Sequence, residues 1–450
     1  MKQKLEIHDL ELFEEKISQN KAYTIARRTV TQNGIYASAI DENVKKSLQN
    51  TFSVDVDAGD ITNQRQSGRC WMFAGLNVIR TILMKKLNVK TIELSQAYLQ
   101  FYDKLEKANF FLEKAIALRN EEPNSRLNVY LLDSGIGDGG HFAMFANLVK
   151  KYGVVPSEEM PDWAVSKSTG ELNAVLTSLL SKDMKLIHDE AKKGAEEEKI
   201  RAEKAKMLDE IYRVLTIAIG LPPKSFTYTY KEKGEKEAKP QVKTLAPLTP
   251  KEFYNQYIAQ DFNEYVPLCD APIEGMNRYQ KYTSSYVNNV VGGDPVVFFN
   301  VKMSELKKAC IRSLKGGDVL WFGADVSSES MRKEGFLAND LIRVDELMDI
   351  TLPSDKGERL TYRSSFCNHA MTLTGVNLTN GRPNRWKVEN SWGKEVGYDG
   401  FFVMDDSWFD NYVYEVFVNR KYVDPEVLKK YDESVAIDEL PFNTLYLKMK

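Results

Sequence analysis

The first half of the chain has apolar residues at helical spacing. After the turn-forming pair Ser67-Gly68, almost every position is apolar, which predicts a largely buried helix beginning near Cys70. Residues 94–118 repeat apolar positions behind Ser95, a favoured N-cap residue, and predict a second helix. Residues 141–153 predict a third helix that ends at Gly153, and the glycine-rich stretch 135–140 before it predicts irregular backbone.

Charged residues dominate other parts of this half. The first forty residues predict an amphipathic helix, followed by an arm that leads toward Asn63. Residues 171–219 have a helical pattern dense in Lys and Glu, which predicts solvent-exposed faces with i,i+4 charge pairs. Residues 231–243 predict an exposed loop because they are mostly charged and contain Gly and Pro.

The pattern changes beyond about residue 290, where β-branched and aromatic runs alternate with Gly, Asn and Asp. These runs predict strands at 296–302, 319–326, 370–378, 385–392 and 412–423. A helical first half followed by a strand-rich part favours an α+β fold with two lobes.

Composition narrows the class of protein. The 450 residues include 61 Lys and Arg and 64 Asp and Glu, a net charge of −3, and 43% are hydrophobic. This composition is typical of a globular protein and gives no reason to expect a nucleic-acid partner. The charged N-terminus does not resemble a secretory signal, and no run reaches the ~18 apolar residues of a membrane span. Four cysteines and four histidines, all scattered, predict no disulfide framework, metal site or cofactor, so we expect a reduced, cytosolic protein.

Several phrases of the sequence occur in the order found in one family. SGRCW (67–71), LSQAYL (94–99), NHAMTLTG (368–375) and VENSWG (388–393) resemble papain-like cysteine peptidases. Within these, the chain is most similar to the intracellular branch that contains bleomycin hydrolase and aminopeptidase C. The resemblance implies a papain-like two-lobed α+β fold. The implied fold has a helical lobe, a β-barrel-like lobe, a large helical insertion and a C-terminal arm.

The resemblance also implies a catalytic set. Cys70 would be the nucleophile, and a helix N-terminus together with an adjacent imidazolium would lower the pKa of its thiol. His369 would take the thiol proton and give it to the leaving amine, and Asn390 would orient the imidazole. Trp392 would shield that hydrogen bond from water. Gln64, six residues before Cys70, would help to form the oxyanion hole.

Three further residues are implied to contact substrate. Gly139 and Gly140 resemble the paired glycines along which papain-like enzymes bind an extended substrate. In the bleomycin hydrolase branch the C-terminal carboxylate, here that of Lys450, meets the substrate ammonium and makes the enzyme an aminopeptidase. The chain differs from its relatives at His141-Phe142, where the family has Gln-Trp. Cys367, His141 and His188 are interpreted as structural residues.

The resemblance leads to a division of the chain and to three functional hypotheses. The expected parts are an N-terminal arm (1–62), a helical lobe with Cys70 (63–156), a helical insertion (157–290), a strand-rich lobe (291–436) and a C-terminal arm (437–450).

The leading hypothesis is a cytosolic cysteine aminopeptidase acting on peptides as a homohexamer. Lys448 and Lys450 would repel an ammonium, so an endo- or oligopeptidase with a displaced arm stays open. A non-catalytic scaffold is the third hypothesis.

Overall fold

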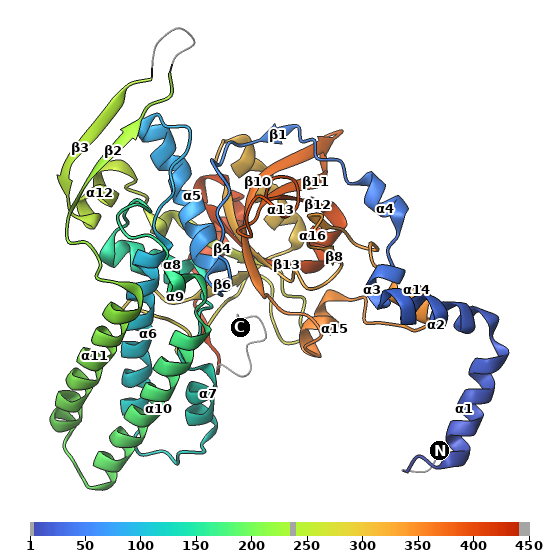
Figure 1. The fold of residues 1–450 in the computed structure, drawn as a ribbon, viewed down its shortest axis with the longest axis horizontal. Helices are drawn as coiled ribbons and strands as arrows, with labels where there is room; N and C mark the ends of the chain where they lie inside the picture. The colour runs from blue at the N-terminus through green and yellow to red at the C-terminus, as the bar shows by residue number, and fades with distance from the viewer. Residues whose placement is uncertain (1–3, 235–239, 441–450) are drawn as a thin grey trace.

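The computed structural model describes residues 4–234 and 240–440. Helices occupy most of the chain up to α12, and a large mixed sheet follows (Figure 1). Within the described residues, no helix combines the length and apolar character that a membrane crossing requires.

The chain begins with four helices that bury no residue, and the first of them extends away from the rest of the molecule (Figure 1). They are α1 (Ile7–Gln19), α2 (Lys21–Asn33), α3 (Ile35–Ser38) and α4 (Glu42–Ser47). The single amphipathic helix expected here is wrong, because Asn20 caps α2 and Gly34 adopts a φ of 85° between α2 and α3. The chain then continues as the expected arm, in which strand β1 (Val54–Asp55) pairs with β10.

Three helices at the centre of the fold match the sequence predictions. They are α5 (Cys70–Leu87), α6 (Gln96–Ala117) and α8 (Phe142–Tyr152). The Ser95 hydroxyl accepts from the Tyr98 backbone N–H, so it is the N-cap of α6. Gly153 ends α8 with a φ of 74°, and a Cβ there would lie 2.2 Å from the Pro250 carbonyl oxygen. The predicted boundaries are confirmed because capping is decided by residues close in sequence.

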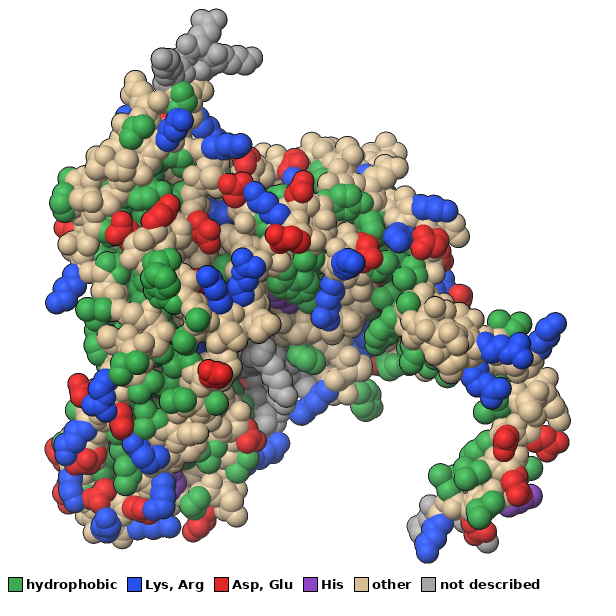
Figure 2. All heavy atoms as spheres, viewed as in Figure 1, with side chains coloured by type: hydrophobic (Ala, Val, Ile, Leu, Met, Phe, Trp, Pro, Cys, Tyr) green, Lys and Arg blue, Asp and Glu red, His purple; other side chains and the backbone are tan. Residues whose placement is uncertain are grey.

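Two long helices form the predicted charged segment. Helices α10 (Gly170–Lys192) and α11 (Glu197–Ile219) bury only one apolar stripe each. Figure 2 shows acidic and basic side chains mixed over the end of this pair. The smaller helices nearby are α7 (Arg126–Ser134), α9 (Ala164–Lys167) and α12 (Pro250–Tyr257).

The expected loop at 231–243 is partly wrong. Strands β2 (Phe226–Lys231) and β3 (Val242–Leu248) form an antiparallel hairpin whose ends reach into this segment. Thr229 pairs with Thr244 across the hairpin, and their hydroxyls are 2.9 Å apart. Cross-strand pairs stabilise these polar residues in strands. The charge-rich sequence around them did not indicate this hairpin.

The main sheet has the strand order β14-β5-β6-β4-β13-β7-β10-β11-β12-β9-β8. The predicted strands correspond to β6 (Val297–Asn300), β7 (Leu320–Ala324), β10 (His369–Thr379), β11 (Arg382–Glu389) and β13 (Val413–Asn419). The others are β4 (Tyr265–Cys269), β5 (Lys281–Thr283), β8 (Ser330–Met331), β9 (Phe336–Leu337), β12 (Phe401–Asp405) and β14 (Ile437–Asp438). Strands β7, β10, β11 and β12 pair antiparallel, whereas β4–β6, β9–β12 and β5–β14 are parallel.

The sheet is covered on both faces. On one face α5 crosses β10, where the Thr372 hydroxyl donates to the Ala74 carbonyl at 3.4 Å. On the same face, the Trp321 indole donates to the Trp71 carbonyl at 3.0 Å. The other face packs against α13 (Met303–Lys315) and α16 (Asp406–Tyr412). This packing places the first turn of α5 against the start of β10, where the candidate site lies.

Candidate active site

Cys70 is the first residue of α5 and is 6% exposed. The residue before it is anchored, because the Arg69 guanidinium donates to both carboxylate oxygens of Asp162 at 2.9 and 2.8 Å. It also donates to Ser67 and Gln100. This buried network fixes the backbone from which the Cys70 thiol projects.

His369 begins β10 and is 4% exposed. Its Nε2 lies 2.8 Å from the Asn390 side-chain oxygen Oδ1. An amide oxygen only accepts, so Nε2 donates and Nδ1 is the basic nitrogen of the neutral ring. The Trp392 ring lies over the imidazole, with centroids 4.7 Å apart. The structure therefore brings these three sequence-predicted residues together.

The Cys70 thiol and His369 belong to neighbouring backbone segments. The backbone N–H groups of Ala370, which follows His369, of Trp71 and of Cys70 itself all act on the Cys70 thiol and lower its pKa. Cys70 and Ala370 also share one buried core. Cys70 and Ala370, 300 positions apart in the sequence, lie close together because α5 packs across β10.

Burial affects the pKa values of both Cys70 and His369. Burial raises the pKa of Cys70 to about 11, although the three backbone N–H groups lower it. Burial lowers the pKa of His369 to about 4, although Asn390 opposes this change. The expected lowering of the thiol pKa by the helix N-terminus and an adjacent imidazolium stays a prediction, because burial opposes the charged form of both groups. Desolvation outweighs the helix N-terminus because both groups are almost fully removed from water.

Gln64 is held beside the same site. Its Nε2 donates to the Ser67 carbonyl at 2.6 Å, and its Oε1 accepts from the Ser391 hydroxyl at 2.6 Å. Its backbone N–H donates to the Ser391 carbonyl at 2.8 Å. The amide has a second N–H that these contacts do not use, so the side chain can still donate to a developing oxyanion.

Gly139 and Gly140 lie on the other side of the Cys70 segment. A Cβ at Gly140 would lie 2.6 Å from the Trp71 ring, so only glycine allows this approach. Both glycines line a cavity of about 820 Å³ between α6, α7 and residues 286–288. His141 and Phe142 are both buried, and His141 also lines this cavity. His141 Nδ1 lies 3.5 Å from Glu415 Oε1, and the ring centroids of Phe142 and Phe417 are 4.6 Å apart.

The remaining candidates are structural or undescribed. Cys367 is buried, and burial raises its pKa well above the usual value, as fits a core thiol. His188 is buried on α10. Lys450 lies outside the described residues. Within the described ranges, no group of three or more His, Cys, Asp and Glu side chains is arranged to hold a metal ion.

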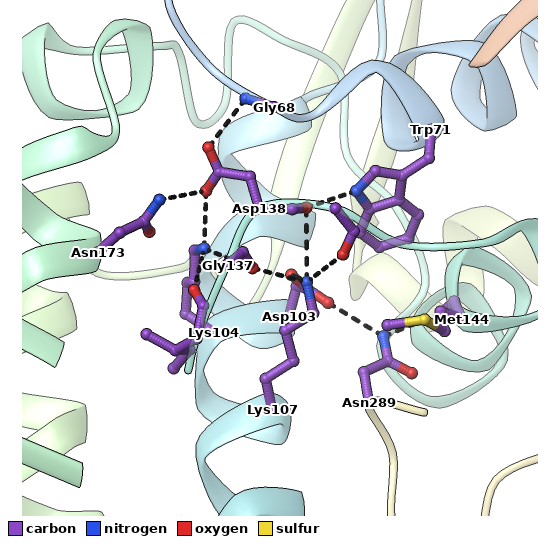
Figure 3. Close-up of polar contacts among 12 residues, drawn as sticks. Gly68, Trp71, Asp103, Lys104, Lys107, Gly137, Asp138, Met144, Asn173 and Asn289 are labelled. Atoms are coloured by element: carbon purple, nitrogen blue, oxygen red, sulfur yellow. Dashed lines mark hydrogen bonds and ion pairs between the residues drawn. The ribbon is translucent and has the colours of Figure 1, made fainter. Parts of the chain in front are cut away.

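Three residues beside the site were not predicted from the sequence. Asp138, Lys104 and Lys107 form a hydrogen-bonded network under the glycine-rich loop (Figure 3). Two signals were available. Asp138 stands alone among glycines in SGIGDGG, and the two lysines are three residues apart on a largely buried helix.

Comparison with known proteins places this geometry in a family. Residues 4–443 match the Peptidase C1-like family. Aminopeptidase C of Listeria monocytogenes is 39% identical over 433 residues, which are 96% of each chain. Aminopeptidase C of Lactobacillus delbrueckii subsp. lactis is 36% identical over 447 residues, covering 99% of this chain and 98% of the relative.

A solved structure gives the same result for the fold. The crystal structure of PepW from Lactobacillus rhamnosis HN001 superposes with a TM-score of 0.93 at 36% identity, covering 98% of both chains. The predicted papain-like α+β fold is confirmed. The chain belongs to the Peptidase C1-like family.

Proposed function

We propose that this protein is a cysteine aminopeptidase that removes N-terminal residues from peptides. The observation that carries the proposal is the His369–Asn390 hydrogen bond of 2.8 Å beside the Cys70 thiol at the N-terminus of α5. This arrangement leaves Nδ1 of His369 as the base. The relatives named aminopeptidase C cover nearly the whole chain and support the same activity.

The proposed reaction has two steps. Cys70 Sγ attacks the peptide carbonyl carbon, the thiol proton passes to Nδ1 of His369, and the carbonyl electron pair moves to the oxygen. Collapse of the oxyanion breaks the C–N bond, and the proton on Nδ1 passes to the leaving amine. Water then attacks the thioester while His369 accepts its proton. The C–S bond breaks, and the proton returns to sulfur.

Other residues serve this chemistry in the proposal. Gln64 and the Cys70 backbone N–H stabilise the oxyanion, and Trp392 shields the bond between His369 and Asn390. Burial opposes the charged forms of Cys70 and His369, so the proposal places the transfer of the thiol proton to Nδ1 together with the attack on the carbonyl carbon. Gly139 and Gly140 line the cavity that would receive the substrate backbone.

The aminopeptidase specificity is proposed to come from the C-terminal arm. The carboxylate of Lys450 would bind the substrate ammonium, as the resemblance implies. A fluorogenic aminoacyl amide with a free amine should be cut at least ~10²-fold faster than its N-acetylated form, because acetylation removes the charged hydrogen bond. Equal rates on both substrates would instead support the endopeptidase hypothesis. If the Cys70→Ala variant cleaves neither the free-amine nor the acetylated substrate, both reactions depend on this site. A Cys70→Ala variant that cleaves them at the wild-type rate would contradict the proposal.

We also propose that the protein is a cytoplasmic homohexamer with the domain division given above. The exposed apolar residues Leu10, Phe13 and Ile17 on α1 support a subunit contact through the N-terminal arm. The four cysteines are free thiols, as is typical of a reducing compartment. Light scattering on the full-length chain and on a variant lacking residues 4–38 tests the assembly. A monomeric full-length protein would contradict it.

A further inference from the structure

One carboxylate joins the loop 135–140 to the segment that carries Cys70. Oδ2 of Asp138 accepts from the Gly68 backbone N–H at 2.9 Å and from the Thr169 hydroxyl. Its Oδ1 accepts from Lys104 Nζ at 2.7 Å and from the Asn173 amide at 3.0 Å (Figure 3). A Cβ at Gly68 would lie 2.8 Å from the Asp138 Cβ, so this approach requires glycine two residues before Cys70.

The backbone of Asp138 makes a second connection to the same segment. Its carbonyl accepts from the Trp71 indole N–H at 2.7 Å, and Gly140 packs directly on the Trp71 ring. Asp138 therefore contacts residues on both sides of Cys70, one through its carboxylate and one through its carbonyl. These two contacts fix the distance between the glycine pair and the nucleophile-bearing turn.

Two lysines one turn apart on α6 hold the rest of the loop. Lys104, only 1% exposed, donates to the carbonyls of Ile136 and Gly137 at 2.8 and 3.1 Å. Lys107 donates to the Gly139 carbonyl at 2.7 Å and pairs with Asp103 at 2.8 Å. Consecutive loop carbonyls thus find donors in the interior, which compensates for the lack of a helix or strand partner.

We propose that Asp138, together with Lys104 and Lys107, is a positioning residue that keeps the substrate-binding glycines in register with Cys70. This inference rests on the proposed peptidase function. It concerns the alignment of substrate and nucleophile and leaves the chemistry of the thiol to the residues described above. A displacement of about 1 Å between reacting groups costs on the order of 10²-fold in rate, so a glycine-rich loop needs such an anchor.

The charge state of the network fits this role. Burial opposes ionisation of Asp138, but Lys104 and the hydrogen bonds hold the pKa of its carboxyl well below the usual range. The carboxylate is therefore present at every working pH. Its charge raises the pKa of the Cys70 thiol, so it does not serve to activate the nucleophile. Its contribution must come from geometry.

The test compares peptide turnover with the reactivity of the thiol itself. Asp138→Asn and Lys107→Met should each lower kcat/KM for a free-amine fluorogenic peptide at least ~10-fold, with a fall in kcat. The rate at which iodoacetamide alkylates Cys70 should differ from the wild-type rate by less than about 3-fold, because this reaction does not depend on the substrate-binding loop. Lys107→Met keeps the test available if Asp138→Asn does not fold, because Lys107 contacts the loop from a less buried position.

A matched variant controls for the loss of a buried ion pair. Asp270→Asn breaks another buried Lys–Asp ion pair, in which Lys356 Nζ lies 2.9 Å from Asp270 Oδ2. This pair does not contact the loop or the Cys70 turn. It should lower stability while leaving kcat/KM within about 3-fold. The inference is overturned if turnover and alkylation fall together in Asp138→Asn, if both stay unchanged, or if Asp270→Asn loses as much turnover. Absence of peptide turnover in the wild-type protein would instead contradict the proposed function.

Discussion

Arg80 of α5 and Glu389 at the end of β11 form a buried ion pair, with Nη2 2.5 Å from Oε1. Asn77, one turn before Arg80, donates to the same oxygen at 2.9 Å. Glu389 directly precedes Asn390, and Arg80 lies on the helix that begins with Cys70. The pair therefore connects the helix of the proposed nucleophile to the strand that presents the proposed orienting amide.

Replacing only one partner of the Arg80–Glu389 pair should lower the free energy of unfolding. At pH 8, above the pKa of about 7 to which burial raises Glu389, Glu389→Gln or Arg80→Met should lower the free energy of unfolding by ~3–5 kcal/mol. Each single change leaves one buried group without its partner, whereas the double variant should recover part of the loss. Urea denaturation measures all three. Asp55→Asn, which breaks the more exposed pair with Lys387, should cost less than about 1 kcal/mol.

Cys70→Ser should remove peptide turnover without unfolding the protein. A serine hydroxyl is a far weaker nucleophile at neutral pH, so we expect less than about 1% of the wild-type kcat. Steady-state kinetics and a thermal melt give the two readouts. The control is Cys310→Ala on α13, which removes another buried thiol and should keep kcat. Substantial turnover by Cys70→Ser would assign the nucleophile elsewhere.

Gln64→Ala should lower kcat by ~10²–10³ and change KM much less, because the oxyanion forms only after attack. The experiment is a full kinetic comparison on one peptide substrate. Gln66→Ala changes the same residue type at an exposed position two residues later and is the matched control. A change confined to KM would make Gln64 a substrate-binding residue.

His369 should make stability depend on pH. Burial lowers its pKa to about 4 from an ordinary value near 6.5, so the unfolded chain binds the proton first as the pH falls. The stabilisation is present above pH 6.5 and is lost between pH 6.5 and 4. The free energy of unfolding of wild type relative to His369→Gln should therefore fall by up to about 3 kcal/mol over that interval. Urea titrations at several pH values measure it, and His8→Gln, at an exposed histidine on α1, should keep the wild-type slope.

Deleting residues 447–450 should change the specificity and keep the chemistry. Without the terminal carboxylate and the end of the arm, the preference for a free amine should disappear and internal peptide bonds should be cut. The same fluorogenic peptide in free and acetylated forms, together with a longer blocked peptide, measures this. A truncated protein that keeps the full preference would locate ammonium recognition elsewhere.

Much of the local structure was predictable because its causes are close in sequence. The apolar density after Gly68, the cap at Ser95 and the stop at Gly153 each act within a few residues. The same holds for the five predicted strands. The β2–β3 hairpin was missed because its strands are mostly exposed and lie among charged residues. Strand β12 was missed because its apolar run is only four residues long and does not indicate a strand without its partner β11. The breaks between α1, α2 and α3 depended on single caps inside a continuous amphipathic pattern.

The candidate chemistry was predictable without the fold, since Gln64, Cys70, His369 and Asn390 stand in motifs whose order and spacing identify the family. The effect of burial on the pKa values of the thiol and the imidazole came from the fold, because the packing of α5 across β10 removes both groups from water. The fold also revealed Asp138 and its two lysines, whose contacts with the loop and the Cys70 segment join residues 30 to 70 positions apart. Burial and long-range polar contacts arise from how elements pack, and a linear pattern does not carry that information.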